Sequence, residues 1–286
     1  YLGLVNCVGD IVYFEEYAYQ SQDTFESILD KILNSIAKVL AEKDKNNIIG
    51  IGITAPGPLD YKKGVILCPP NFLETKNVPI KNIVEKRFGL PAYLDNNANA
   101  YALAEKYYGS AKDYSNFIYM SVDEGVGTGI MLRDELYRGR GGFGSELGHI
   151  TINMDGPRCS CGNYGCVEVY ASIPNLIKQL GDVVQHKILP SPYIEGIMKR
   201  RKLKWEDFLA GLNIKDPACI SLLQREAEYL SNIVVTASNI FEPQAIIIGS
   251  QLAECGELII EPLKDIVYGR TVTRDIHLPT LHVSTT

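Results

Sequence analysis

Long hydrophobic runs are missing from this sequence of 286 residues. No apolar stretch approaches the roughly 20 residues that a helix needs to cross a bilayer, which argues against an integral membrane protein. The first residues also lack a basic segment followed by an apolar core, which is the pattern of a secretory signal. With 46% hydrophobic residues, the composition is ordinary for a soluble globular protein. We therefore expect a cytoplasmic protein.

An excess of basic residues is missing as well. The chain has 28 Lys and Arg against 34 Asp and Glu, for a formal net charge of -6. This balance argues against a chain that mainly binds nucleic acid. The one basic cluster, Lys199 to Lys204, precedes Trp205. A nucleic-acid patch is one interpretation of it, but we prefer a solvated helix face.

Cysteine is also scarce. The seven cysteines are an odd number that suits a reducing compartment better than a disulfide framework. Cys7, Cys68 and Cys255 are scattered, and we expect them to be small buried apolar residues.

Three other cysteines are clustered in Cys-Ser-Cys-Gly-Asn-Tyr-Gly-Cys, from Cys159 to Cys166, and His149 precedes this run by nine intervening residues. Three thiols and an imidazole suit tetrahedral zinc better than an oxygen-preferring cation. Accidental cysteines or a disulfide are the alternatives, but a bridge from Cys159 to Cys161 would close a strained loop. Glu146 and Glu168 flank the cluster, so a closed metal site would fix two carboxylates near one place, which indicates a functional site.

Hydrophobic periodicity predicts a mixed α/β protein. Strands are expected at residues 1–5, 11–17, 48–54, 91–95, 116–122, 125–133, 135–138 and 245–248, and helices from residue 23 onward and at residues 79–88, 98–108 and 220–240. The first helix has Asp23 and Glu26 in capping positions. Because the pattern of strands then begins again, we expect two lobes, residues 1–112 and 113–286, with a cleft between them.

Polar side chains gather where a predicted strand runs into a predicted helix, at Asp95-Asn96-Asn97-Ala98-Asn99. Such junctions are favoured places for ligands. Helix capping is the alternative role for these amides. We weigh capping and binding evenly for Asn99 and favour binding for Asn96.

This junction, the segment from Gly144 to His149 and the cysteine run together resemble the ROK family of repressors and sugar kinases. The most specific match is Glu-x-Gly-His followed by Cys-x-Cys-Gly-x-x-Gly-Cys-x-Glu, from Glu146 to Glu168. The resemblance covers nearly the whole chain. It implies the two-lobed, ribonuclease-H-like fold of the actin and hexokinase superfamily, with an inter-lobe cleft and a zinc-braced loop.

The resemblance also implies site residues. The Zn²⁺ cofactor would be bound by His149, Cys159, Cys161 and Cys166. The sugar-binding residues would be Asn96, Asn97, Glu146, His149 and Glu168. Carboxylates and amides suit this role, because they accept or donate paired hydrogen bonds to neighbouring hydroxyls. Zinc would act as a structural brace that orients the imidazole and ties down the loops that carry both glutamates.

Three departures from the kinase pattern argue against catalysis. In kinases of this family the junction has an Asp that serves as the general base, and here that position is Asn97. The kinases present Gly-Thr-Gly at the second phosphate-binding turn, whereas this chain adds Asp123 and Glu124 there, which would repel ATP. The adenosine-side Gly-Gly is Gly249-Ser250. The first phosphate loop, Asp-x-Gly-Gly-Thr, is not in the sequence.

The same family includes transcriptional regulators, in which a winged helix-turn-helix domain precedes a sugar-sensing body. We therefore interpret the chain as the sugar-sensing and dimerisation body of such a regulator. A degenerate, glucokinase-like or fructokinase-like ATP-dependent sugar kinase is the alternative, followed by a structural or peptide-binding protein. The missing initiator Met and the end at Thr286 suggest a fragment, with the DNA-binding domain upstream. The expected partners are a monosaccharide, operator DNA through that domain, and further copies of the chain.

Overall fold

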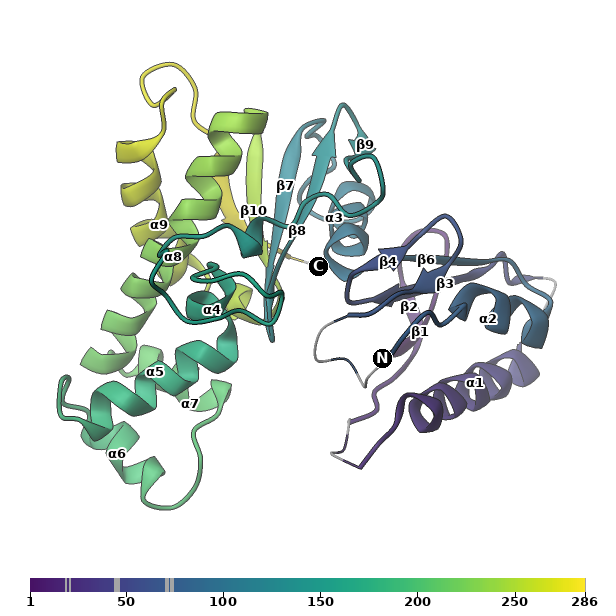
Figure 1. Cartoon of the computed structure of the whole chain (residues 1–286), viewed down its shortest axis with the longest axis horizontal. Helices are drawn as coiled ribbons and strands as arrows, with labels where there is room; N and C mark the ends of the chain where they lie inside the picture. The colour runs from purple at the N-terminus through teal and green to yellow at the C-terminus, as the bar shows by residue number, and fades with distance from the viewer. Residues whose placement is uncertain (19, 21, 44–46, 70–71, 73–74, 286) are drawn as a thin grey trace. The chain divides into compact units, whose positions relative to one another are not determined.

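The computed structural model describes residues 1–285 except 19, 21, 44–46, 70–71 and 73–74. The chain divides into two compact units. Unit 1 comprises Tyr1–Ala100 and Arg138–Gly144, and unit 2 comprises Tyr101–Tyr137 and Ser145–Thr286. Both units contain helices and strands (Figure 1), so the predicted mixed α/β class is confirmed.

Unit 1 contains, in its described residues, three pairs of strands and the helices beside them. The hairpin β1–β2 and the pair β4–β5 are antiparallel, whereas β3 and β6 run parallel. The elements are β1 (Leu2–Val5), β2 (Ile11–Glu15), α1 (Phe25–Glu42), β3 (Ile51–Ala55), β4 (Leu59–Asp60), β5 (Val65–Ile66), α2 (Ile80–Phe88), β6 (Ala92–Asn96) and the start of α3 (Asn97–Tyr107). Ile36 of α1, Phe88 of α2 and Leu94 of β6 contribute to one shared apolar core. The polar junction thus follows a strand that this core holds in place.

The N-cap of the first helix lies one residue later than the sequence indicates, at Thr24 instead of Asp23. Thr24 is the N-cap, and its side chain accepts a hydrogen bond from the backbone of Ser27. Asp23 instead pairs with Lys31, whose Nζ lies 2.8 Å from its carboxylate. Thr24 is the cap because Ser27 completes a reciprocal capping box with it.

Unit 2 is centred on a five-stranded mixed sheet in the order β11-β10-β7-β8-β9. The strands β11, β10 and β7 are parallel, and β8 runs antiparallel to both of its neighbours. The strands are β7 (Phe117–Val122), β8 (Val126–Leu132), β9 (Glu135–Leu136), β10 (Ala245–Gly249) and β11 (Thr280–Val283). The helices are the short η2 (Leu147–His149) and η3 (Ser250–Cys255), together with α4 (Glu168–Ala171), α5 (Ile173–Gln185), α6 (Pro192–Met198), α7 (Trp205–Asn213), α8 (Pro217–Phe241) and α9 (Glu257–Arg270).

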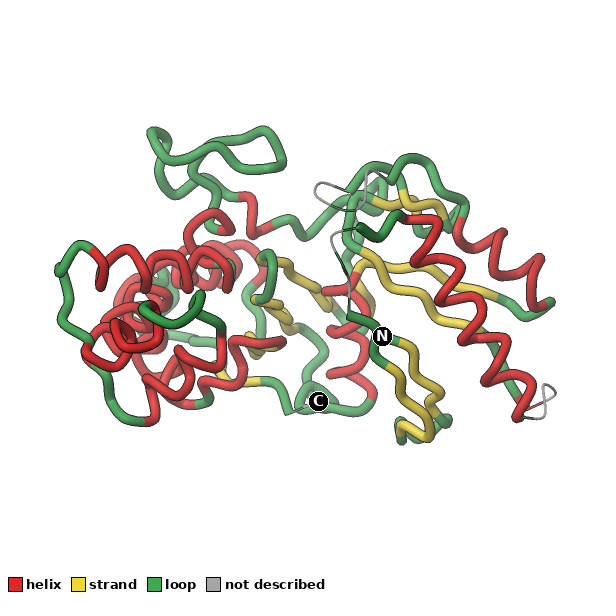
Figure 2. Tube along the Cα trace, turned by 90° about the horizontal axis from the view of Figure 1, so that it is seen from below, coloured by secondary structure: helices red, strands yellow, loops and turns green. Residues whose placement is uncertain are grey.

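The two faces of this sheet pack against different helices. Ile118 and Met120 of β7 share a core with α5, α8 and α9, and the alternate residues Phe117 and Tyr119 pack with Ala102 of α3. Within unit 2, Figure 2 shows most of the helices on one side of its strands. Buried on both faces, β7 and β10 are rigid supports for the loops at their ends. No helix in the described part of the chain is long and apolar enough to cross a membrane.

The division between the units falls inside α3, between Ala100 and Tyr101. The sequence places the boundary between residues 112 and 113. The earlier position follows from packing, because Ala102 and Ala111 are fully buried against the strands of unit 2. A helix that starts in one unit and packs in the other carries no local signal of that change.

The scattered cysteines are not all buried. Cys255 is buried as predicted, and the seventh cysteine, Cys219, is buried as well. Cys7 and Cys68 are exposed, so that part of the prediction is wrong. Cys7 lies in the turn of the β1–β2 hairpin and Cys68 in the loop after β5, where few side chains can cover them.

Candidate functional site

Three thiols and one imidazole meet in a single loop region of unit 2. His149 ends η2, and Cys159, Cys161 and Cys166 follow in the loop before α4. Their ligand atoms all lie within 4.8 Å of one another. The structure therefore brings together the four residues that the sequence predicts as zinc ligands.

The spacing of these atoms suits a tetrahedral ion. Cys161 Sγ lies 3.8 Å from Cys166 Sγ, and Cys159 Sγ lies 3.6 Å from His149 Nδ1. Zinc bonds of about 2.3 Å to sulfur and about 2.0 Å to nitrogen place tetrahedral ligand atoms roughly 3.6 to 3.8 Å apart. The donor set thus fits a closed structural zinc site. In such a site Nδ1 of His149 would be the ligand, which fixes the tautomer that carries its proton on Nε2.

Glycines allow the loop to fold tightly enough for this cluster. Gly165 has φ +60°, and a Cβ at that position would lie 1.7 Å from the carbonyl oxygen of Asn153. Backbone amides close the turn, with Cys159 N donating to Asn163 O at 2.8 Å and Gly162 N donating to Cys159 O at 3.0 Å. These contacts fold the loop so that the ligand atoms of Cys159 and Cys166 lie within 4.8 Å of each other.

Burial keeps two of the thiols neutral until a cation binds. Cys159 and Cys166 are 3% and 0% exposed, whereas Cys161 is exposed. Burial raises the pKa of Cys159, and burial together with the neighbouring thiols raises the pKa of Cys166 to about 12. A metal ion needs thiolates as ligands, so binding must displace these protons.

We expect one zinc ion per chain, measured by elemental analysis of protein prepared without chelator. Cys161→Ser should lower the zinc content well below one equivalent, and Cys68→Ser, at an exposed thiol outside the cluster, should leave it unchanged. Because the pKa of Cys166 is raised, zinc added to metal-free protein should release protons at neutral pH, and acid should expel the ion. Protein that retains clearly less than one equivalent would contradict the zinc assignment.

Two carboxylates lie beside this cluster. Glu168 Oε1 is 3.7 Å from Cys159 Sγ, and its Oε2 accepts a hydrogen bond of 3.1 Å from the backbone N of Val126. Glu146 Oε2 lies 4.0 Å from His149 Nε2. Unit 2 thus places both glutamates and the outer nitrogen of the imidazole around one short segment, where they offer acceptors and a donor to a polyhydroxylated ligand.

The surroundings of Glu146 alter its acidity. Desolvation by burial is the main cause that raises the pKa of this carboxyl, with a smaller contribution from Glu168, and His149 opposes the shift. The side chain is nevertheless 52% exposed.

The polar junction of unit 1 is held by hydrogen bonds of its own. Asn96 Oδ1 accepts from Ala98 N at 2.9 Å at the start of α3, and Asn99 Nδ2 donates to Asp95 Oδ1 at 2.8 Å. Asn96 therefore caps α3, and its sugar contact stays a prediction. Asn99 is buried and bonded to Asp95. Asn96 is the cap because it directly precedes Asn97, the first helical residue. Its Nδ2 and the exposed side chain of Asn97 have no hydrogen-bond partner among the described residues.

Arg138 belongs to this junction although nothing in its sequence context indicates it. Its Nη2 lies 2.6 Å from Asp95 Oδ2, and its guanidinium carbon lies 4.9 Å from the ring centre of Tyr61. The residue is 43 positions from Asp95, and its segment returns to unit 1 after three strands of unit 2. Only the folded chain shows that the Asp95 carboxylate is committed to an ion pair.

The turns that would approach a nucleotide in a kinase are bonded internally. Asp123 Oδ1 accepts from Gln251 N at 3.1 Å, and Ser121 Oγ lies 2.8 Å from Ser250 Oγ. Glu124 is exposed. Both acidic residues therefore lie at the end of β7, where the sequence predicts them to oppose phosphate groups.

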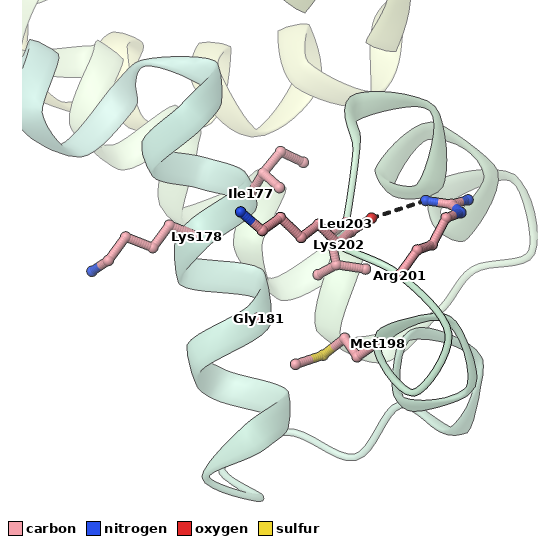
Figure 3. Close-up of a pocket in the computed structure, with 7 residues that line it drawn as sticks. All are labelled: Ile177, Lys178, Gly181, Met198, Arg201, Lys202 and Leu203. Carbon is pink, nitrogen blue, oxygen red and sulfur yellow. Dashed lines mark hydrogen bonds between the residues drawn. The ribbon is translucent and has the colours of Figure 1, made fainter.

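The basic tract borders a shallow hollow rather than a charged face. An open cavity of about 340 Å³ between α5 and the segment after α6 is lined by Ile177, Lys178, Gly181, Met198, Arg201, Lys202 and Leu203 (Figure 3). Arg201 is bound at 2.6 and 2.7 Å to the carboxylate of Asp207. The tract lies in the turn between α6 and α7, exposed but not on a helix face, so the predicted helix face is wrong in its placement.

Comparison with known proteins gives the same family in sequence and in structure. A model of the ROK family matches residues 2–280. A xylose repressor of Caldicellulosiruptor bescii is 35% identical over 294 residues, which cover 98% of this chain and 70% of that protein. A ROK family transcriptional regulator, a homologue of the E. coli MLC protein, has a TM-score of 0.86 and 27% identity, covering 99% of this chain and 70% of that one.

A kinase of the family is as similar to this chain in structure as the regulator is. The ROK family glucokinase from Streptomyces griseus, solved with glucose and AMPPNP, has a TM-score of 0.87 and 26% identity, covering 99% of this chain and 89% of that one. The fold is therefore shared by regulators and kinases, and the side chains of the site must distinguish them. The predicted resemblance is confirmed, because the family model matches nearly the whole sequence: this chain belongs to the ROK family.

Proposed function

We propose that this chain is the sugar-sensing and dimerisation body of a ROK-family transcriptional regulator, which binds a free sugar without phosphorylating it. The observation that carries the proposal is Asn97, which stands where the family's kinases have their general base. An amide does not accept the hydroxyl proton at neutral pH, and loss of a general base removes about 10² to 10⁴ in rate. The similarity to a xylose repressor supports the regulator.

Asp95 does not replace the missing base. It is the nearest carboxylate along the chain, but Arg138 binds one of its oxygens at 2.6 Å and Asn99 donates to the other at 2.8 Å. Both contacts occupy lone pairs that would otherwise take a proton. The junction thus keeps hydrogen-bonding amides and lacks an available proton acceptor.

In unit 2 we assign sugar contacts to Glu146, His149 and Glu168. A carboxylate accepts from two neighbouring hydroxyls, and the Nε2–H of the imidazole donates to a hydroxyl oxygen. Zinc, when bound through Nδ1, would fix that tautomer and brace the loop. In unit 1 we assign further sugar contacts to Asn96 through its Nδ2 and to Asn97.

Regulation requires that the sugar changes the DNA-binding form. We propose that the chain acts as a dimer or dimer of dimers in the cytoplasm, with a winged helix-turn-helix domain upstream that binds operator DNA. A sugar that binds one conformation more tightly shifts the population toward it and so changes the spacing of the two DNA-binding domains. Comparing operator affinity of the longer protein with and without sugar, at fixed salt, tests this coupling.

We expect sugar to bind and to remain unphosphorylated. A thermal-shift panel of D-xylose, D-glucose and other free sugars and their phosphates should raise the melting temperature for at least one free sugar. Calorimetry should then show a saturable sugar site and no site for magnesium-ATP, because Asp123 and Glu124 oppose the phosphates. Asn97→Asp should restore little activity, and Asn213→Asp, at an exposed helix end, is the control for an added charge.

A sugar kinase of low activity is the second candidate. It is favoured by the TM-score of 0.87 to a glucokinase that binds glucose and AMPPNP. Rapid ATP-dependent phosphorylation of any sugar in the panel by the unmodified protein would establish the kinase and overturn the regulator.

A further inference from the structure

The turn between β7 and β8 touches two parts of unit 2 that are far apart in the sequence. On one side, Val126 N donates to Glu168 Oε2 at 3.1 Å. A Cβ at Gly125 would lie 2.7 Å from the same oxygen, so the absence of a side chain there leaves room for the carboxylate. Gly148 packs directly against the start of β8, because a Cβ on it would lie 1.9 Å from the carbonyl oxygen of Val126. The segments that carry Glu146 and Glu168 therefore both rest on this turn and the start of β8.

On its other side the turn is tied to η3 and α5. Asp123 Oδ1 accepts from Gln251 N at 3.1 Å, and the carbonyl oxygen of Asp123 accepts from Ile173 N at 2.9 Å. The first of these bonds joins residues 128 positions apart. Asp123 is thus the one side chain of the turn that reaches η3 within the part of the chain described here.

The contact at η3 is held against local strain. Ser250 has φ +62°, a conformation that side-chain-bearing residues rarely adopt, and its Oγ lies 2.8 Å from Ser121 Oγ. Gly249 before it has no room for a side chain, since a Cβ would lie 1.8 Å from the hydroxyl of Tyr119. Such a segment keeps its geometry only while its neighbours hold it, so η3 depends on the end of β7.

We propose that the β7–β8 turn is a positioning element for Glu168, and that Asp123 is the positioning residue that couples this carboxylate to η3. The inference rests on the proposed function only where it concerns sugar. A sugar hydroxyl that donates to Glu168 Oε2 weakens or strengthens the hydrogen bond from Val126 N to that oxygen. The resulting shift of the turn then alters the hydrogen bond between Asp123 and Gln251 N. In this chain the turn that would hold a phosphate in a kinase instead joins the sugar-binding carboxylate to the C-terminal part of unit 2.

Hydrogen exchange of the ligand-free protein tests the connection without any sugar. In Asp123→Ala, exchange should accelerate at Gln251, which loses its acceptor, and also at Val126, which does not touch the altered side chain. Asp123→Asn keeps an acceptor and should restore protection at both amides. Glu124→Ala, at the exposed neighbour, is the matched control and should change neither. If Asp123→Ala accelerates exchange at Gln251 alone, or if Asp123→Asn behaves like Ala, the coupling is refuted.

Sugar affinity supplies the second measurement, made by calorimetry with whichever panel sugar binds. Asp123→Ala should weaken binding roughly 5-fold or more, and it should add nothing in a Glu168→Gln background, because both changes act on one contact. Gly125→Ala should weaken binding similarly by displacing the carboxylate, with little change in melting temperature. Additive losses in the double variant would overturn the proposal. If no sugar binds the unmodified protein while the exchange results hold, the proposed function fails and the turn's positioning role stands.

Discussion

Glu168→Ala is expected to weaken sugar binding roughly 100-fold or more. Hydrogen bonds to a charged group contribute about 1.5–3 kcal/mol each, and a carboxylate that accepts from two hydroxyls loses both. Glu168→Gln keeps the size of the side chain and one acceptor, so its loss should be smaller. Calorimetry with the sugar identified in the panel measures both variants.

The same substitution separates binding from folding. Glu168 also accepts from Val126 N and lies 3.7 Å from Cys159 Sγ, so zinc content and melting temperature must be measured alongside affinity. Glu228→Ala, at an exposed position on α8, is the control and should bind sugar normally. In a protein that carries the proposed upstream DNA-binding domain, Glu168→Ala should abolish the sugar response and leave ligand-free operator affinity nearly unchanged. A variant that folds, retains zinc and still binds sugar at full strength would remove Glu168 from the site.

Glu226→Gln is expected to stabilise the protein at neutral pH, on the order of 2 kcal/mol. Glu226 lies on the buried face of α8, is 2% exposed, and its Oε1 has no hydrogen-bond partner among the described residues. Desolvation raises the pKa of this carboxyl well above its ordinary value. The folded state therefore keeps a proton that the unfolded state releases, and stability falls as pH rises above the unfolded pKa of about 4.3.

The pH dependence tests this sign. The advantage of Glu226→Gln should be present at pH 7.5 and should shrink toward zero near pH 4, where the carboxyl is protonated in both states. Melting temperatures of the variant and the unmodified protein, compared at each pH, cancel the contributions of other titrating groups. Glu228 lies two residues further along the same helix and is exposed, so Glu228→Gln should show no such dependence. An advantage that stays constant from pH 4 to 7.5 would mean that the carboxyl does not titrate as the structure indicates.

The secondary structure of much of the chain follows from local pattern. The hairpin, the helix α8 and the strands β7 and β10 lie where periodicity predicts them, because their apolar residues recur at the period of the element. Capping was less predictable. Thr24 and Asp23 are both good caps, and the choice between them depends on Ser27 and Lys31, which only the folded helix brings into contact.

The sequence by itself determined the family and the cluster of possible metal ligands. His149 and Cys159 to Cys166 lie within one short stretch, so their spacing alone places the four ligand atoms near one another. Only the tertiary structure decided which polar side chains are already held in ion pairs or hydrogen bonds. Arg138 neutralises Asp95 from 43 positions away, and Asp123 reaches Gln251 across 128 positions. Contacts of this kind depend on how strands and helices are ordered in space, and no local pattern of residue types encodes that order.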